Sequence, residues 1–178
     1  LLLWSHATNI PDSVKKVNSA GAIVWQRELP KAFLQILFAG NGFYYHTQRS
    51  TDTIWYYDTL GNNLWHYNTL GRMRGFGVDA EGNCLALVWT SETQATLLKV
   101  NSTGAKVFQT PISDPLIRDF TPSCDYDGPY LDNSGKAWVL CTFARWVTKG
   151  TPSTGSNVHT EYVYLYQFDV NTGALLLQ

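Results

Sequence analysis

Short apolar stretches alternate with compact polar turns along nearly the whole chain. In four segments an Asn or Asp opens the turn, a Gly closes it, and a large apolar residue follows four positions after that Gly. The segments run from Asn18 through Gly21 to Trp25, from Asp58 through Gly61 to Trp65, from Asn101 through Gly104 to Phe108, and from Asp169 through Gly173 to Leu177. Asx side chains bond back to the turn backbone, and Gly adopts the positive φ that is costly for other residues. Each segment therefore predicts a β-hairpin.

A second series of Asx and Gly turns lies between the members of the first. These turns fall within residues 38–43, 78–84 and 131–137, and each precedes a short apolar run. The repeating unit is strand, turn, strand, polar loop, strand, turn, strand, which predicts a four-stranded antiparallel meander. The glycines Gly21, Gly61 and Gly104 are 40 and 43 residues apart, which matches the roughly 40–45 residues of a propeller blade.

Two motifs within these repeats resemble known blade sequences. The stretch Gly77-Val-Asp-Ala-Glu-Gly-Asn-Cys-Leu-Ala-Leu-Val-Trp-Thr-Ser, followed by Leu98-Lys-Val-Asn-Ser-Thr-Gly, resembles the repeat of bacterial-type β-propeller repeat proteins. The Gly-x-x-x-Trp endings at 21–25 and 61–65 are similar to the blade signature of quinoprotein-dehydrogenase-like propellers. The resemblance covers nearly the whole chain and implies an all-β fold, a β-propeller of four-stranded antiparallel blades. It concerns architecture, because the same blades occur in enzymes, assembly factors and surface proteins.

Counting strands against this template gives an incomplete first blade. Residues 1–6 align with the second strand of a blade, so we expect one three-stranded unit followed by three four-stranded ones within a single domain 1–178. The units span approximately 1–30, 31–70, 71–112 and 113–178. Propellers close at about four to eight blades, and an open array exposes apolar blade faces. Either the chain is a small four-bladed ring or, as we favour, it is an arc of a larger ring completed by missing sequence or another chain.

The large apolar residue that ends each repeat predicts a shared structural role. Recurrence at one position favours packing between neighbouring blades for Trp25, Trp65, Phe108 and Leu177. Aromatic platforms for sugar stacking are the alternative, but such platforms would suit positions that differ from blade to blade.

Composition and charge exclude several classes of protein. The chain has 178 residues, of which 44% are apolar, 15% charged and 14% aromatic, a composition that excludes disorder and coiled coil. The net charge is -1 and the basic residues are scattered, so we expect neither nucleic acid nor an anionic membrane as the main partner. The longest apolar runs fall far short of the roughly 18 residues of a membrane-spanning helix.

The cysteines and one N-glycosylation sequon give information about the cellular compartment of the protein. Counting back from the turn at 132–135 places Cys124 within a couple of residues of Cys141 on the adjacent strand, which is compatible with a disulfide or with two free buried thiols. Cys84 has no candidate partner and is expected to be a small buried hydrophobe. Asn101-Ser102-Thr103 is the only N-glycosylation sequon. Together with the Ser, Thr and Gly-rich loops, these features point to an extracellular or cell-surface location.

Recognised catalytic motifs are absent from the sequence. There is no Gly-x-Ser-x-Gly elbow, no His-Glu-x-x-His and no phosphate-binding Gly-rich loop with Lys. His6, His46 and His159 are predicted near loops that join second and third strands. They could form a composite histidine site there, but the favoured interpretation is that they are exposed loop residues. Asp125 and Asp127 resemble the start of a calcium loop but lack the later acidic residue, so a solvated loop is favoured. We expect no cofactor.

The fourth unit is where the repeat pattern changes. Gly104 and Gly173 are 69 residues apart, and the surplus falls within 113–129 and 148–160. Insertions into a repeat often form the binding face. We expect the loops at 114–120 and 149–159 to line one rim of the channel together with neighbouring side chains. The candidate binding residues are Arg72, Arg74, Arg118, Asp119, Trp146 and His159.

The sequence therefore favours a non-catalytic binding or structural module. The module would belong to a secreted or surface assembly and would contact a protein or a glycan through the inserted-loop face, alongside any remaining propeller blades. Two alternatives stay open. One is part of a propeller enzyme, a quinoprotein-like oxidoreductase or a hydrolase, and the other is a lectin.

Overall fold

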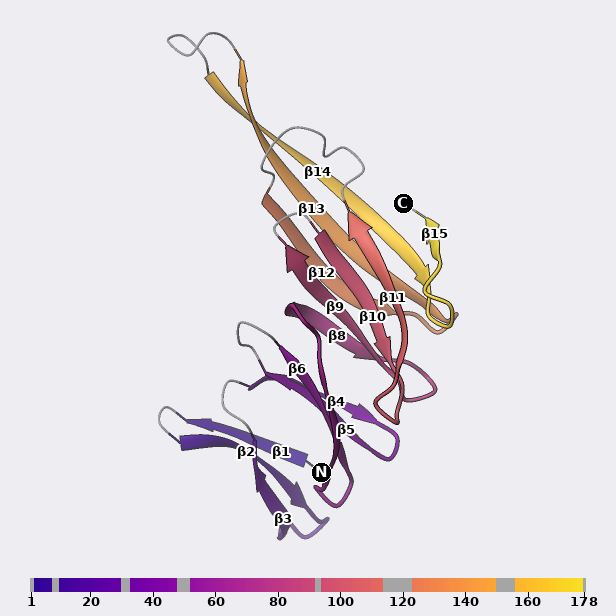
Figure 1. The fold of residues 1–178 in the computed structure, drawn as a ribbon. Coiled ribbons are helices and arrows are strands. Elements are labelled where there is room, and N and C mark those ends of the chain that lie inside the picture. The colour runs from indigo at the N-terminus through magenta and orange to yellow at the C-terminus, as the bar shows by residue number, and fades with distance from the viewer. Residues whose placement is uncertain are drawn as a thin grey trace. The chain divides into compact units, whose positions relative to one another are not determined.

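A computed structural model describes residues 2–7, 10–29, 33–47, 52–91, 94–113, 123–149 and 156–177. The regular structure of these residues consists of fifteen β-strands in four antiparallel sheets, which we call A to D (Figure 1). Sheet A contains β1 (Leu2–Ala7), β2 (Ile10–Val17) and β3 (Ile23–Glu28), and sheet B contains β4 (Phe33–Ala39), β5 (Gly42–Thr47), β6 (Thr53–Asp58) and β7 (Asn63–Asn68). Sheet C contains β8 (Arg72–Val78), β9 (Cys84–Ser91), β10 (Gln94–Val100) and β11 (Lys106–Ser113), and sheet D contains β12 (Ser123–Leu131), β13 (Lys136–Lys149), β14 (Ser156–Asp169) and β15 (Leu175–Leu177).

Every sheet is a meander in which strands adjacent in the sequence are adjacent in space. Sheet A has three strands and sheets B, C and D have four each. This arrangement confirms the all-β prediction and the expected series of one incomplete unit and three complete ones. The fold is that of β-propeller blades. Within the described residues, no helix has the length and apolar character needed to cross a membrane.

The repeated turns form as the sequence predicts. The Asp58 side chain accepts hydrogen bonds from the backbone N–H groups of Leu60 and Asn62, both at 2.8 Å. Gly61, which closes the turn, has a φ of 78°, a conformation that side chains other than glycine rarely adopt. Asn18 makes the matching pair of bonds to Ala20 and Ala22 at 3.0 and 2.9 Å. The Asx and Gly pair therefore determines where each hairpin reverses.

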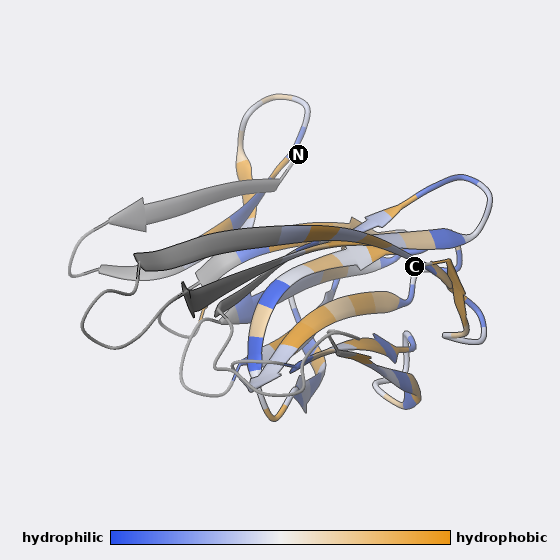
Figure 2. Cartoon of the chain, turned by 90° about the horizontal axis from the view of Figure 1, so that it is seen from above, coloured by the Kyte–Doolittle hydropathy of each residue, from blue (hydrophilic) through white to orange (hydrophobic). Residues whose placement is uncertain are grey.

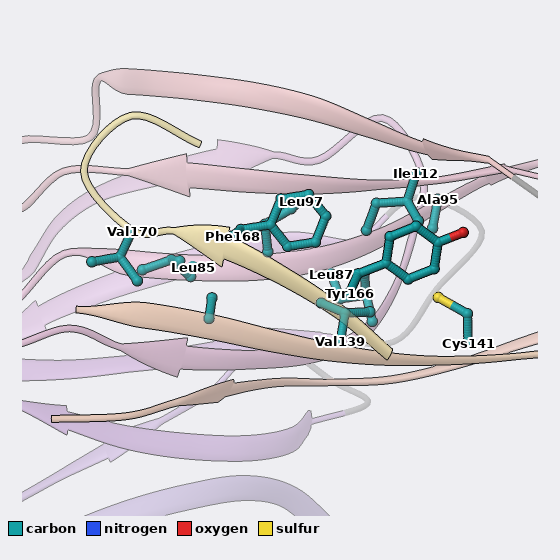
Figure 3. Close-up of a cluster of buried hydrophobic side chains, with 11 residues drawn as sticks. Leu85, Leu87, Ala95, Leu97, Ile112, Val139, Cys141, Tyr166, Phe168 and Val170 are labelled. Carbon is teal, nitrogen blue, oxygen red and sulfur yellow. The ribbon is translucent and has the colours of Figure 1, made fainter. Parts of the chain in front are cut away.

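The chain divides into two compact units, each with its own core. The first unit comprises Leu1–Arg72 with Ser102–Gly104, and the second comprises Met73–Asn101 with Ala105–Gln178. In the first, sheets A and B bury Val14, Leu29, Phe43, Tyr45 and Tyr57. In the second, sheet C contributes Leu85, Leu87, Ala95, Leu97 and Ile112, and they pack against Ala137, Val139, Cys141, Tyr166, Phe168 and Val170 of the sheet D region (Figure 3). Each core is thus formed by two sheets packed face to face.

One prediction about the fourth unit is wrong at both of its boundaries, while residues 150–155 lie outside the described residues. Residues 149–159 were expected to form a loop, but β13 continues to Lys149 and β14 begins at Ser156. The two strands pair without a register shift from Lys136 opposite Asp169 to Lys149 opposite Ser156. The segment is polar, which suggested a loop. β-branched residues lie at its two ends, however, with Val147 and Thr148 just before it and Val158 within it, and such residues favour strands.

Candidate functional site

The aromatic residues that end the first three repeats each pack against the glycine turn of the next sheet. A Cβ added to Gly61 would lie 3.2 Å from the Trp25 ring, and one added to Gly104 would lie 3.0 Å from the Trp65 ring. Phe108 lies closer still to Gly173, at 2.6 Å from such a Cβ. The predicted role of Trp25, Trp65 and Phe108 in packing between neighbouring blades is therefore confirmed. The same prediction is not confirmed for Leu177, which is 53% exposed.

Hydrogen bonds to turn carbonyls accompany this packing. The indole Nε1 of Trp25 donates to the Thr59 carbonyl at 3.1 Å, and that of Trp65 donates to the Ser102 carbonyl at 2.9 Å. Phe108 has no donor, but Thr110 on the same strand donates its hydroxyl to the Gly173 carbonyl at 2.7 Å. We use the word clasp for this combination, in which an aromatic ring of one sheet packs on the glycine of the next turn and a side chain of the same strand donates a hydrogen bond to a carbonyl of that turn.

A buried ion pair supports the clasp of the second unit. Lys99 Nζ lies 2.7 Å from Asp79 Oδ2, with the two side chains 5% and 4% exposed, and donates to the Val170 carbonyl at 2.8 Å. Burial alone would raise the pKa of Asp79, but hydrogen bonds from Lys99 and Asn83 and the charge of Lys99 lower it below its ordinary value. Sequence reasoning missed this pair, although a charge inside the apolar run 97–100 was a signal for it.

A cavity of about 440 Å³ lies between the turns of sheets C and D. It is lined by residues 78–81, 131–133, 135 and 170–171. The Asp132 carboxylate of this cavity makes hydrogen bonds within its own hairpin. It accepts from Trp138 Nε1 at 2.9 Å and from the backbone N–H of Ser134 at 2.8 Å, and these bonds lower the pKa of Asp132. Among the described side chains, no three His, Cys, Asp or Glu residues lie close enough together to hold a metal ion.

Two of the candidate binding residues, Arg72 and Arg74, are exposed side chains on β8. The Arg74 guanidinium carbon lies 4.2 Å from the centroid of the Trp89 ring, a cation–π contact between β8 and β9. This contact is at the end of sheet C away from the turn at 79–82. Arg118 and Asp119 lie outside the described residues.

Trp146 and His159 are directly opposite each other on neighbouring strands. Both lie beyond Ala144, the last residue of β13 that pairs with β12, and β15 pairs with β14 only at Gln167 and Phe168. In Figure 1, β13 and β14 continue past β12 as a two-stranded projection. We call residues 145–149 and 156–160 the ribbon. The structure therefore brings together two candidate residues that are 13 positions apart in the sequence.

No family model and no curated protein matches the chain. Its structure is similar to a protein of unknown function from Bacteroides caccae, with 12% identity and a TM-score of 0.41 over 94% of this chain and 75% of that one. It is also similar to BamB from Moraxella catarrhalis, with 18% identity and a TM-score of 0.47 over 92% of this chain. The chain spans 54% of that BamB structure.

Of the two candidate calcium ligands, Asp125 and Asp127, the structure describes the side chain of Asp127. The Asp127 carboxylate accepts from the Tyr130 hydroxyl at 2.6 Å and from the Gly128 backbone N–H at 2.9 Å, bonds that occupy both of its oxygens. The side chain of Asp125 lies outside the described residues, so calcium binding there stays a prediction.

Neither the disulfide nor the glycosylation site is established. The strand register places Cys141 opposite Tyr126, and Cys124 opposite Phe143. Diagonal neighbours of this kind are about 7–8 Å apart, farther than the ~4.4–6.8 Å that usually separates the Cα atoms of a disulfide. The register therefore does not favour the bond, and the side chain of Cys124 lies outside the described residues. Asn101 opens its turn by accepting from the Ala105 N–H at 2.9 Å, and its glycosylation stays a prediction.

The histidines do not share one environment. His46 was expected to be an exposed loop residue, and this is wrong: it is 3% exposed and lies within β5, which continues through it to Thr47. His66 is exposed and lies against Trp55, with ring centroids 4.9 Å apart. The side chains of His6 and His159 lie outside the described residues, so a composite histidine site stays untested.

We expect His46 to make the first unit sensitive to acid. Burial lowers the pKa of His46 to about 4, below its ordinary 6.5, so the folded state holds the ring neutral. The unfolded chain binds a proton below pH 6.5 that the folded chain does not. The free energy of unfolding should therefore keep its highest value above pH 6.5 and decrease as the pH falls toward 4, with a slope that approaches ~1.4 kcal/mol per pH unit.

Urea unfolding of the His46→Leu variant across this pH range provides the measurement. The variant should lose the slope, whereas His66→Ala, which changes an exposed histidine, should keep it. A slope that survives in His46→Leu would assign the acid sensitivity to other groups.

Proposed function

We propose that this chain is a non-catalytic binding or structural module in which the ribbon contacts a protein partner. The observation that supports this most directly is the projection of β13 and β14 beyond β12 and β15. In the described strands, the ribbon residues pair only with each other, so their outer backbone edges are available to another chain. Strand addition at such an edge is a common mode of peptide recognition.

The residue types in the ribbon suit protein recognition. Trp and Arg are the residue types most enriched among binding hot spots, and the ribbon carries Arg145 next to Trp146. Lys149 and His159 add donors of hydrogen bonds to the same hairpin. These four residues lie within five consecutive paired positions of one hairpin.

Site-specific photo-crosslinking in the native host tests this proposal. A photoreactive phenylalanine analogue placed at 146 or at 159 should capture the same protein, because these positions are cross-strand neighbours. The same analogue at Val107, an exposed position on β11, should not capture it.

The captured protein then allows a quantitative prediction. Trp146→Ala should weaken its binding at least about tenfold, because loss of an aromatic hot spot commonly costs 2 kcal/mol or more. Val107→Ala is the matched control and should bind as the native chain does. Different captured proteins at 146 and 159, or equal capture at 107, would argue against the ribbon. Binding on a glycan array that is lost in Trp146→Ala would favour a lectin.

A location in a secreted or surface assembly is part of the same proposal. It is supported by the Asn101-Ser102-Thr103 sequon, in which Ser102 and Thr103 are exposed. A shift in mass after treatment of the native protein with an N-glycosidase tests it, and Asn101→Gln should abolish that shift.

A further inference from the structure

Leu70 has an unusual backbone conformation for a leucine. It lies between β7 and β8, and its φ is 58°, the one positive φ of a non-glycine residue in the described part of the chain. A left-handed backbone is costly for most side chains, because the Cβ atom comes too close to the following carbonyl oxygen. Glycine adopts this conformation without that cost. The chain therefore holds Leu70 in a conformation that is strained for its residue type.

A repeated tripeptide shows that the local sequence does not require this strain. Thr-Leu-Gly occurs twice in the chain, at 59–61 and at 69–71. In the first copy Gly61 takes the positive φ, 78°, whereas in the second copy Leu70 takes it although a glycine is its neighbour. The same three residues thus form an unstrained turn once and a strained turn once. Backbone strain of this kind is concentrated at binding sites and active sites.

Hydrogen bonds on both sides of Leu70 fix its turn. The Thr69 N–H donates to the Asp52 carbonyl at 3.0 Å, and the Asp52 N–H donates to the Gly71 carbonyl at 3.1 Å. The Thr69 hydroxyl lies 2.8 Å from each of these two carbonyls and donates to them. Asp52 is 0% exposed and Thr69 is 5% exposed, so the protein shields these bonds from water. The turn is therefore held firmly at its base, with Leu70 between the two bonded residues.

The Leu70 side chain is exposed, although its two neighbours are bonded into the protein. Hydrophobic residues of this chain lie mainly along the strands, whereas the turns are mostly hydrophilic (Figure 2). Leu70 is 84% exposed, more than any other exposed large hydrophobic residue that the structure describes. A side chain with so little contact to the rest of the chain cannot offset the strain of its own backbone. The benefit of a leucine at this position must come from outside the chain.

Arg72 places a positive charge two residues after Leu70. Its side chain is exposed, and its guanidinium group forms no ion pair with any residue that the structure describes. Arginine is enriched among the hot spots of protein interfaces, and its guanidinium group bonds carboxylates strongly. An exposed leucine beside an unpaired guanidinium group therefore fits a surface with an apolar pocket and a carboxylate at the edge of that pocket.

We propose that the turn at 69–71 docks on a protein partner, with Leu70 inserted into an apolar pocket and Arg72 paired with a carboxylate at its edge. The fixed turn favours this contact, because little conformational entropy remains to be lost on binding. A protein fits better than a lipid surface, because one leucine adds too little apolar area to anchor a domain in a bilayer. The site shares no residue with the ribbon, so it can fail while the proposed function holds.

Substitution by asparagine separates the contact from the fold. Asn tolerates a positive φ, so Leu70→Asn should not lower the urea midpoint of the first unit. A photoreactive phenylalanine analogue at position 70 in the native host should capture a protein, whose affinity for the native chain and for each variant is then measured by calorimetry. Leu70→Asn should weaken this binding at least about tenfold. Arg72→Glu should also weaken it at least about tenfold, because it places two negative charges together.

Leu60→Asn is the matched control. Leu60 is the central residue of the same tripeptide in its unstrained form and is 62% exposed, so this variant should bind the captured protein as the native chain does. Capture of no protein at position 70, unchanged binding by Leu70→Asn, or an equal loss in Leu60→Asn would overturn the proposal. A lower urea midpoint in Leu70→Asn would assign Leu70 to the fold instead. Binding of the native chain to phosphatidylglycerol and phosphatidylcholine vesicles that is lost in Leu70→Asn would overturn the proposal in favour of a membrane.

Discussion

Replacing Lys99 with Met is expected to lower the free energy of unfolding of the second unit by about 3–5 kcal/mol. The variant leaves the Asp79 carboxylate, 4% exposed, without the ammonium group that lies 2.7 Å away. It also removes the donor to the Val170 carbonyl and so one link between sheets C and D. Hydrogen exchange of the amides in β9, β10, β13 and β14 during urea unfolding measures the loss in this unit separately from the first.

The double variant Asp79→Asn with Lys99→Met is the matched control. It removes both charges, so most of the stability should return, because an uncompensated buried charge costs more than the absence of the pair. The pKa of Asp79 is lowered in the folded state, so its contribution is present above about pH 3.9 and is lost as the pH falls below that value. A Lys99→Met chain as stable as the native one would show that the pair contributes no net stability.

Replacing Trp65 with Ala is expected to destabilise the first unit by about 2–4 kcal/mol, somewhat less than the ~3–5 of a fully buried Trp because Trp65 is half-buried. The ring packs on Gly104, stacks on Tyr56 with centroids 5.4 Å apart and lies 5.7 Å from Tyr44. Its indole N–H also donates to the Ser102 carbonyl. Hydrogen exchange of the amides in β5, β6 and β7 during urea unfolding measures the change.

Two further variants separate the contributions of Trp65. Trp65→Phe keeps an aromatic ring and loses the hydrogen bond, so it should cost about 1 kcal/mol. His66→Ala alters the neighbouring exposed residue and should change stability by no more than ~0.5 kcal/mol. A Trp65→Ala loss equal to that of Trp65→Phe would mean that the ring itself adds little and that the clasp depends on its hydrogen bond.

The sequence predicts the fold of this protein in unusual detail because its signals are local. Asx and Gly turns are determined by side-chain bonds and backbone φ within four or five residues, so the hairpins at Asn18 and Asp58 are predictable without any tertiary contact. The repetition of a large apolar residue after each turn indicated packing between blades, and the rings of Trp25, Trp65 and Phe108 fulfil that role.

The candidate site was predictable only in part. The sequence marked the fourth unit as exceptional and singled out Trp146 and His159, but it assigned His159 to a loop, whereas His159 lies on β14. A polar segment with β-branched residues is compatible with a loop or with an extended hairpin, and only the pairing of β13 with β14 decides between them. His46 was misplaced for a similar reason, since whether a strand ends before or after one residue depends on the partner strand.

The sequence by itself determined the order of strands and the turns, because each of these depends on residues close together in the chain. The tertiary structure decided what those residues meet: that Lys99 reaches Asp79 and Val170, and that Trp65 lies on Gly104. Contacts between residues far apart in the sequence depend on how sheets pack, and that packing leaves no local signal.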